Sequence, residues 1–464
     1  MRTTLDIPRE LIEEARNLLG LKSMTETVIL ALRDLVRRKR VEDLKSMLGS
    51  IDPRAGCGRI ATTSAVNRSA TELRLLLVTL AVLSWGCADR VSTGDEAAVR
   101  IDTVGGVVRV QNPEAAPRWR LEPLVSIGSM GGFGEARPDE FGLVRSVVAD
   151  ERGQIYVADT RSNEIRVFDA AGNHLRTIGR AGSGPGEFRT VYSLAWLGDT
   201  LAVMDPRNAR IELVTGDGAP LGTWRWFPLT GAADLVRFYP TGPSEAYTLG
   251  LRPGSGRTLE RKYLRYTPAG VSDSLVVQAP EPTRPAGVVC RHDQGLTAFQ
   301  VPFAPSFMAA PAPQRNAAVA LSDRYRIALV RDNDTTRVSE RPHTPVPVTT
   351  AEWDSALVSW HEFRERVPGA RCDAEFWRPE HKPAITGIWF DHEGRMVVEA
   401  TSPDGPVLDF YDDDGRIRGR VRAPDRAPGS DPYFRNEHVY TIARDSLDVP
   451  LVRVYRVVHA EESD

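Results

Sequence analysis

The chain has 464 residues, of which 41% are hydrophobic and 26% charged, and its formal net charge at pH 7 is -3. A chain of this length is too long to fold around a single hydrophobic core, and its composition is not that of a wholly disordered chain. We therefore expect several globular domains. Because the total charge is nearly balanced, affinity for nucleic acid is expected only from a local basic segment. The run RDLVRRKR at residues 33–40 is such a segment.

The start of the chain has the pattern of one strand followed by two helices. The segment RTTLDI alternates, which places Arg2, Thr4 and Asp6 on a polar face and apolar side chains on the other. Pro8 suits the first turn of a helix, and apolar residues then recur at helical spacing. A second helix begins at Ser23, where S-x-x-E can form a capping box. The pattern predicts a small α+β module of the ribbon-helix-helix type.

This module is predicted to bind DNA as a dimer through residues 1–48. One strand and two amphipathic helices bury too little surface to fold alone, so two copies must pair. A two-stranded ribbon fits the major groove and reads base edges, while a helix start offers backbone N–H groups to phosphate. Asp6 lies near the strand end, where a role in the turn is the alternative. The expected DNA-binding residues are Arg2, Thr4, Asp6, Ser23, Met24 and Thr25.

The first forty residues, MRTTLDIPRELIEEARNLLGLKSMTETVILALRDLVRRKR, resemble the VapB family of type II antitoxins. The resemblance extends over residues 1–52 and implies a dimer that represses its own operon and a downstream segment that blocks a PIN-domain toxin. After residue 52 the chain continues PRAGCGRIATTSAV where a toxin-binding tail is expected, so the resemblance supports DNA binding more than toxin neutralisation. The alternative is a helical hairpin with a solvated basic face.

Residues 73–87 resemble a bacterial lipoprotein signal that follows a linker at 53–72. The segment LRLLLVTLAVLSWGC joins a basic start to a short apolar run and a cysteine, so Cys87 is a candidate lipidation site. It is shorter than a membrane-spanning helix, and a buried core helix is the alternative. Residues 88–120 are then expected to be a flexible tether. The antitoxin-like module would be cytoplasmic, and the remainder exported and anchored to the membrane.

The four cysteines, Cys57, Cys87, Cys290 and Cys372, lie far apart and include no CxxC pair. This spacing does not support a zinc site. If the body is exported, one disulfide, between Cys290 and Cys372, is an alternative to four free thiols.

Residues 121–460 repeat a unit of four strands. VVADERGQIYVADTRSNEIRVFDAAGNHLRTIG sets the pattern, and LAVMDPRNARIELVTGDGAPLGTW repeats it about 46 residues later. Weaker copies follow at 246–274, 317–337, 385–421 and 439–458. A period of this size predicts a six-bladed β-propeller, closed by the strand near 124–127 pairing with the last blade. GRAGSGPGEF at 179–188 resembles the link between NHL repeats, and the body resembles bacterial six-bladed propeller lipoproteins.

An insert at residues 350–367 is predicted to be helical. AEWDSALVSWHEFRERV places Trp353, Leu357 and Trp360 on one stripe. We expect this helix to cap one face of the ring, with the stripe used for packing rather than as a ligand cage.

The body shows no motif of a known enzyme and no cofactor signature, so we expect no enzyme activity. HExxH, GxSxG, Walker and Rossmann patterns are missing from the sequence, and DFYDDDG lacks the spacing of an EF-hand loop. Asp159 and Asp205 end the second strands of two neighbouring units, where a structural role is favoured over metal binding.

Three functional hypotheses remain open. The first is a multidomain regulator in which the DNA-binding antitoxin module carries a propeller that binds an unknown ligand or protein. The second is an exported propeller lipoprotein whose N-terminal part is a fusion or comes from a mis-assigned start. The third is a propeller hydrolase or lyase, which needs a convergent acidic or histidine cluster at the channel.

Overall fold

The computed structural model describes Glu13 and residues 99–459, except for 131–136, 227–237, 243–244, 254–258, 268–269, 279–283, 285, 294 and 333. The chain divides into two compact units, 1–93 and 94–464, and every element described below belongs to the second. The ribbon, its two helices, the linker and the export-like segment predicted for the N-terminal part therefore lie outside the described residues.

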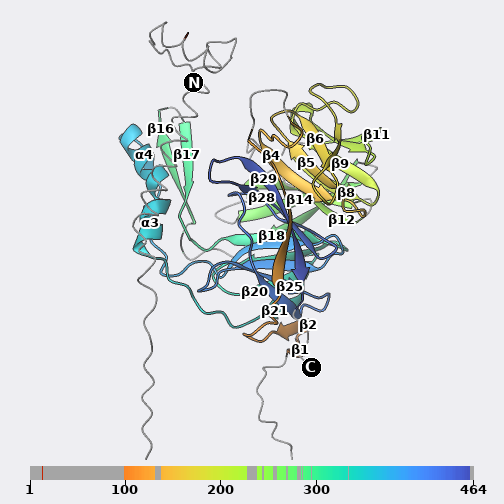
Figure 1. Cartoon of the computed structure of the whole chain (residues 1–464). Coiled ribbons are helices and arrows are strands. Elements are labelled where there is room, and N and C mark those ends of the chain that lie inside the picture. The colour runs from red at the N-terminus through yellow and green to blue at the C-terminus, as the bar shows by residue number, and fades with distance from the viewer. Residues whose placement is uncertain are drawn as a thin grey trace, which may run out of the picture. The chain divides into compact units, whose positions relative to one another are not determined.

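Six blades, each an antiparallel sheet of four strands, make up most of the second unit within the described residues (Figure 1). Blade 1 contains β4 (Val144–Ala149), β5 (Ile155–Asp159), β6 (Glu164–Phe168) and β7 (His174–Ile178). Blade 2 contains β8 (Ser193–Leu197), β9 (Thr200–Asp205), the short 3-10 turn η1 (Pro206–Asn208), β10 (Arg210–Val214) and β11 (Pro220–Arg225). Blade 3 contains β12 (Phe238–Gly242), β13 (Glu245–Pro253), β14 (Leu259–Thr267) and β15 (Gly270–Gln278).

The other three blades use more distant parts of the chain. Blade 4 contains β18 (Phe307–Ala312), β19 (Asn316–Leu321), β20 (Arg326–Arg331) and β21 (Asp334–Glu340). Blade 5 contains β23 (Ile385–Phe390), β24 (Met396–Ala400), β25 (Val407–Tyr411) and β26 (Ile417–Arg422). Blade 6 contains β27 (Tyr433–Arg435), β28 (His438–Arg444), β29 (Pro450–Val458) and β3 (Arg120–Ile127).

Turns of sequence Asp-x-x-Gly set the hairpins of blades 1 and 5. In each, the aspartate carboxylate accepts a hydrogen bond of 2.7–2.8 Å from the backbone N–H four residues later. The glycines have φ between 75° and 87°, a left-handed conformation that side chains with a Cβ rarely adopt. Four hairpins share this turn, and their aspartates are Asp150, Asp169, Asp391 and Asp412.

The predicted closure of the ring is confirmed. Strand β3, which precedes blade 1 in sequence, pairs antiparallel with β29 and completes blade 6. Val125 lies opposite Val454 in this register, and Glu122 forms an ion pair of 2.6 Å with Arg456. The first and last parts of the propeller therefore share one sheet, which leaves the ring without an open end.

The core lies between blades rather than within them. Each of six buried apolar clusters combines side chains from two neighbouring blades, and together they follow the ring from blade 1 back to blade 1. The second strands supply the most buried stretches: β5 and β24 are buried along their whole length. This burial on both faces explains their continuous apolar sequences IYVAD and MVV.

Residues 100–111, which the sequence assigns to a flexible tether, form a hairpin on blade 4. Strands β1 (Arg100–Val104) and β2 (Val107–Gln111) pair antiparallel, and β2 adds to β21 in parallel. Gly105 and Gly106, with φ of 59° and 82°, make the tight turn that a two-residue hairpin requires. The prediction of a flexible tether is therefore wrong for these residues. Alternating side chains on both sides of two glycines specify a hairpin, although the polar composition of the segment is also typical of a linker.

The predicted helical insert belongs to a separate small layer. Helices α3 (Thr350–Ala356) and α4 (Val358–Arg366) pack on a sheet of β16 (Gly287–His292), β17 (Gly295–Gln300) and β22 (Arg371–Cys372). Trp353 and Trp360 contact the apolar cluster of this layer, which agrees with a packing role. The helices were expected to cap one face of the ring. They cover the small sheet of β16, β17 and β22 instead.

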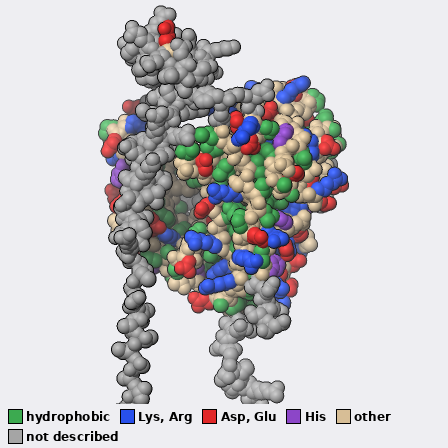
Figure 2. Space-filling model, in the orientation of Figure 1, with side chains coloured by type: hydrophobic (Ala, Val, Ile, Leu, Met, Phe, Trp, Pro, Cys, Tyr) green, Lys and Arg blue, Asp and Glu red, His purple; other side chains and the backbone are tan. Residues whose placement is uncertain are grey.

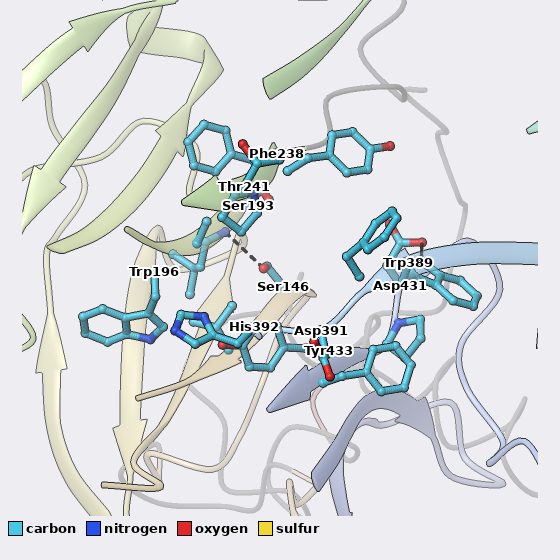
Figure 3. Close-up of a pocket in the computed structure, with 18 of the residues that line it drawn as sticks. Ser146, Ser193, Trp196, Phe238, Thr241, Trp389, Asp391, His392, Asp431 and Tyr433 are labelled. Carbon is cyan, nitrogen blue, oxygen red and sulfur yellow. Dashed lines mark hydrogen bonds between the residues drawn. The ribbon is translucent and has the colours of Figure 1, made fainter. Parts of the chain in front are cut away.

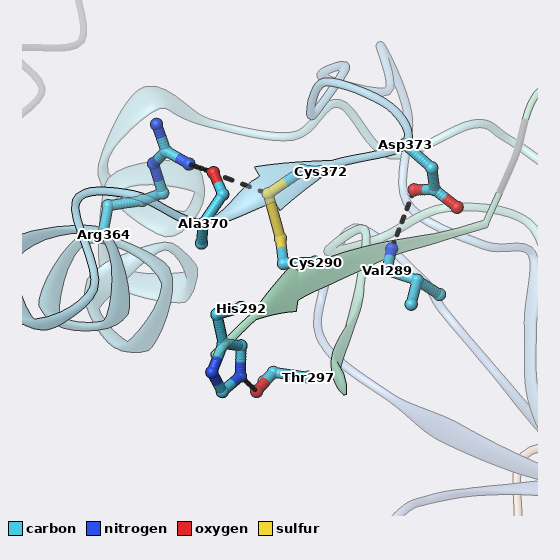
Figure 4. Close-up of a disulfide and its surroundings, with 8 residues drawn as sticks. All are labelled: Val289, Cys290, His292, Thr297, Arg364, Ala370, Cys372 and Asp373. Atoms are coloured by element: carbon cyan, nitrogen blue, oxygen red, sulfur yellow. Dashed lines mark hydrogen bonds between the residues drawn. A yellow bond between two sulfur atoms is a disulfide. The ribbon is translucent and has the colours of Figure 1, made fainter. Parts of the chain in front are cut away.

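A disulfide between Cys290 and Cys372 joins β16 to β22, where the two residues are direct partners (Figure 4). Asp373, next to the second cysteine, accepts a hydrogen bond of 2.8 Å from the backbone N–H of Val289. Arg364 of α4 donates to the carbonyl of Ala370 at 3.0 Å. The disulfide therefore fixes the short strand β22 to the hairpin of β16 and β17. Through the loop that precedes β22 it also holds helix α4 in place.

The visible face of the second unit carries acidic and basic side chains interspersed with apolar ones (Figure 2). None of the helices among the described residues is long and apolar enough to cross a membrane.

Candidate functional site

The seven residues predicted to bind DNA or carry a lipid all lie outside the described residues. The structure therefore gives no geometry for these sites. They are Arg2, Thr4, Asp6, Ser23, Met24, Thr25 and Cys87.

A cavity among the described residues lies at the centre of the ring. It has a volume of about 480 Å³, and residues from β4, β8, β12, β18, β23 and β27 line it. These are the strands at the inner end of each sheet, so all six blades contribute to one site. Figure 3 shows Trp196 and His392 on one side of this cavity, Trp389 and Asp431 on the other, and Phe238 with Thr241 above them.

Eight aromatic side chains line the cavity. Trp196, Phe238 and Phe434 are at least nine-tenths buried, and the others are half-buried. Aromatic faces contribute large apolar contact area and stack on flat rings. The lining aromatic residues are Tyr192, Trp196, Phe238, Tyr239, Trp389, Phe390, Tyr433 and Phe434.

Several polar groups at the wall already have protein partners. Ser146 accepts a hydrogen bond of 3.1 Å from the backbone N–H of Leu194, which ties blade 1 to blade 2. The indole Nε1 of Trp389 donates to Asp431 at 3.0 Å. The hydroxyl of Tyr433 donates to the carbonyl of Ala149 at 3.2 Å, and burial raises the pKa of this phenol to about 12. Tyr433 therefore stays protonated at neutral pH.

Asp391 is the buried carboxyl group of the cavity, with 7% of its side chain exposed. Burial raises its pKa to about 6, although the backbone N–H and the guanidinium of Arg395, the latter at 2.7 Å, favour the ionised form. Burial also lowers the pKa of the adjacent His392, assisted by the positive charge of Arg435, so the imidazole is neutral at pH 7. One group is thus half-protonated near pH 6, and the other is uncharged at pH 7.

Trp196 presents a hydrogen-bond donor without a partner. Its indole Nε1 is fully shielded from solvent and has no acceptor among the residues that the structure describes. The ring is 5% exposed and packs edge-on against Tyr156, with ring centroids 5.1 Å apart. Buried N–H groups are nearly always paired, because an unmade hydrogen bond costs about 1–3 kcal/mol. Trp196 thus carries a buried N–H without an acceptor among the described residues, and its ring packs in the cluster between blades 1 and 2.

Asp159 and Asp205 do not line the cavity and act on the backbone between blades. Asp159 accepts hydrogen bonds of 2.9 Å from the N–H groups of Gly142 and Leu143. Asp205 does the same for Thr190 at 2.9 Å and for Arg189 at 3.1 Å. The two side chains hold the loop that enters their own blade, which agrees with the structural role favoured from sequence. Among the described residues, no group of three or more His, Cys, Asp or Glu side chains is placed to hold a metal ion.

The cavity residues were not identified from the sequence. Trp196, Trp389 and Tyr433 belong to the first strand of three different repeats, and sequence periodicity treats them as core. A usable signal was the presence of an aromatic residue in each of the first strands SLAWL, ITGIWF and YFR. This arrangement can bind a flat molecule between aromatic faces, and near pH 6 it can exchange a proton at Asp391.

Comparison with known proteins supports a chain of two different parts. Residues 1–47 match the model of VapB, a bacterial antitoxin of type II toxin-antitoxin systems. Residues 139–205 match the model of DUF5128, described as a 6-bladed beta-propeller. No curated protein matches the chain.

Similar solved structures are distant. A member of the DUF4221 family from Bacteroides vulgatus is 10% identical, with a TM-score of 0.39, and covers 75% of this chain and 98% of its own. Virginiamycin B lyase from Staphylococcus aureus is 10% identical with a TM-score of 0.27, covering 68% and 95%. The calcium-binding protein regucalcin from Agrobacterium tumefaciens is 13% identical with a TM-score of 0.28, covering 76% and 97%. No activity follows from scores this low. The chain thus carries a VapB-type antitoxin segment at residues 1–47 and a segment of a six-bladed β-propeller family at residues 139–205.

Proposed function

We propose that the propeller is a non-catalytic binding body whose central cavity holds a small molecule. The observation that carries this proposal is the cavity of about 480 Å³, to which the inner strand of every blade contributes. Ligand pockets have this size, an aromatic wall and a few polar groups. Binding is favoured over acid–base chemistry because both oxygens of Asp391 already contact Arg395, at 2.7 Å each.

A titration with the neutral fluorescent probe N-phenyl-1-naphthylamine tests this proposal on the full chain. We expect saturable binding of one probe per chain. Ser193→Trp on β8 fills the cavity and should abolish it, because Ser193 lines the wall. Thr223→Trp is the matched control, since this exposed residue lies on β11, the outermost strand of the same sheet. Equal binding by both variants, or no saturable binding by the parent chain, would overturn the proposal.

We propose that residues 1–52 bind operator DNA as a homodimer formed through residues 1–48 and so regulate their own operon. The support is the match of residues 1–47 to the VapB model and the polar alternation of the first strand. Arg2 and Thr4 would contact bases, and residues 23–25 would contact phosphate. A PIN-domain toxin is the proposed protein partner.

A gel-shift titration of the full chain on the palindromic DNA upstream of its own gene tests this assignment. Binding should weaken steeply between 50 and 200 mM salt, because phosphate contacts release counterions. Arg2→Ala should lower the affinity by roughly 10-fold or more. Arg207→Ala, at an exposed arginine of η1, is the control and should bind like the parent. Absence of binding at low salt, or binding by a monomer, refutes the proposal.

The second candidate is an exported propeller lipoprotein whose antitoxin-like part is a fusion or a mis-assigned start. The specific observation in its favour is the disulfide between Cys290 and Cys372, because such bonds persist mainly in oxidising compartments. Mass spectrometry of the protein from its native membrane fraction distinguishes the two candidates. A mature chain that begins at a lipidated Cys87 supports export, and an intact chain from Met1 in the cytosol excludes it.

A further inference from the structure

Arg145 brings an accessible positive charge to the wall of the central cavity. It lies near the start of β4, is exposed, and lines the cavity. Its guanidinium lies 5.5 Å from the centre of the Tyr192 ring, which belongs to the same wall. Within the part of the chain that the structure describes, no carboxylate pairs with it. A molecule in the cavity can therefore reach this charge without displacing an acidic partner.

The contact with Tyr192 leaves the hydrogen-bond donors of Arg145 available. A guanidinium over an aromatic face is attracted by the ring, and its N–H groups lie in its own plane. A planar carboxylate can accept two of these N–H groups at once, and such a pair is stronger than a hydrogen bond between neutral groups. The site therefore suits a ligand that carries a carboxylate.

The acidic side chains of the same wall are already engaged. Asp391 and Glu393 form ion pairs with Arg395, at 2.7 and 3.3 Å. Asp431 accepts a hydrogen bond of 3.0 Å from the indole N–H of Trp389. A cation that entered the cavity would compete with these donors for the carboxylates, whereas an anion meets a guanidinium without an acidic partner. The wall therefore favours an anion over a cation.

We propose that the ligand of the central cavity is a flat ring compound with a carboxylate, which pairs with Arg145 while the ring packs against the aromatic wall. This inference rests on the proposed binding function and names its ligand class. The charge of the ligand would stay at the exposed guanidinium, so it need not enter the apolar part of the cavity, where burial of an ion is costly. The ring would replace solvent against side chains such as Trp389 and Tyr433.

A second pocket, of about 300 Å³, also contains arginines but offers them less readily. Arg176 of this pocket already donates to Tyr156 and to the carbonyl of Gly216. The side chain of Arg435 is 4% exposed and forms an ion pair of 3.4 Å with Glu151. An anion would have to break these contacts to bind there, so the central cavity is favoured.

Three probes of nearly equal shape test the pairing by displacement of N-phenyl-1-naphthylamine from the full chain at neutral pH. They are the anion 2-naphthoate, the neutral 2-acetylnaphthalene and the cation 2-naphthylmethylammonium. At low salt we expect 2-naphthoate to bind roughly 3- to 10-fold tighter than 2-acetylnaphthalene, and the cation to bind weakest. This preference should shrink in about 0.5 M salt, because screening weakens an exposed ion pair.

Arg145→Gln removes the charge and should reduce the preference for 2-naphthoate to about 1-fold, whereas Arg145→Lys should retain part of it. Arg207→Gln is the matched control, because it removes an equal charge at an exposed residue of η1, and its preference should equal that of the parent. The preference is a ratio of two affinities in one protein, so a general loss of packing in a variant cancels from it.

A preference that persists in Arg145→Gln, or that Arg207→Gln reduces equally, overturns the pairing. A neutral or cationic probe that binds tightest overturns it too, and so does a reporter that binds but that none of the probes displaces. In each of these cases saturable binding of the reporter leaves the cavity as a binding site. If the reporter itself does not bind, the binding function fails together with the pairing.

Discussion

Replacement of Asp205 by alanine tests the role of the aspartates that end the second strands. This carboxylate is fully buried and accepts hydrogen bonds from the backbone of Arg189 and Thr190 and from the side chain of Asn208, the last at 2.6 Å. Asp205→Ala leaves these three donors without their acceptor inside the boundary between blades 1 and 2. Each buried donor that loses its partner costs about 1–3 kcal/mol. Because water can reach some of them, we expect a loss of about 3–5 kcal/mol in the free energy of unfolding.

Equilibrium unfolding in urea at pH 7, followed by tryptophan fluorescence, measures this loss. Asp205→Asn keeps one acceptor oxygen and should lose about half as much. Asp217→Ala is the control, because 88% of the Asp217 side chain is exposed, and it should stay within about 0.5 kcal/mol of the parent. A loss below about 1 kcal/mol for Asp205→Ala refutes the structural role. So does a calcium-dependent rise in stability of the parent that Asp205→Ala abolishes, since this identifies a metal ligand.

Three further predictions concern a titrating group, the disulfide and the ring closure. Asp391 has a pKa of about 6 in the fold, against an ordinary value of 3.8. The protonated carboxyl group therefore stabilises the fold below pH 4, and the free energy of unfolding should fall by up to about 3 kcal/mol as the pH rises through 6. Asp391→Asn should remove this pH dependence of the unfolding midpoint. The double variant Cys290→Ser, Cys372→Ser lacks a disulfide that joins residues 82 positions apart. The insert should lose about 4 kcal/mol of stability. Amide hydrogen exchange should become faster in the insert and stay unchanged in the ring. Val125→Pro interrupts the pairing of β3 with β29 and should cost about 3 kcal/mol or more in thermal unfolding, whereas Leu124→Ala, at a half-exposed side chain of the same strand, should cost less than 1 kcal/mol.

Each of these predictions has a distinct contrary outcome. A midpoint that rises between pH 4 and 7 contradicts the raised pKa of Asp391. Faster exchange throughout the ring of the double cysteine variant contradicts a separate insert. A Val125→Pro variant as stable as the parent shows that β3 does not close the propeller.

The blades could be predicted because their local signals agree. Each Asp-x-x-Gly turn specifies a hairpin, and apolar runs such as IYVAD mark a strand buried on both faces. Both signals are short-range, so one repeat suffices to recognise the unit. Where the turns lack this pattern, as between β13 and β14, the copies are weaker in sequence although the sheet is the same.

The candidate site could not be predicted because it depends on pairings over long sequence distances. Trp196 and His392 come from blades 2 and 5, and only closure of the ring brings them to one cavity. The hairpin of β1 and β2 was missed for a related reason, because its edge partner β21 lies more than two hundred residues later. The DNA-binding face and the lipidation site remain predictions from the sequence.

A crystal structure of the full chain with N-phenyl-1-naphthylamine tests the central claim most directly. We predict the naphthalene ring of the probe in the central cavity, among the inner strands of the six blades. A probe bound elsewhere while the central cavity stays filled with water would contradict the assignment of this cavity as the ligand site.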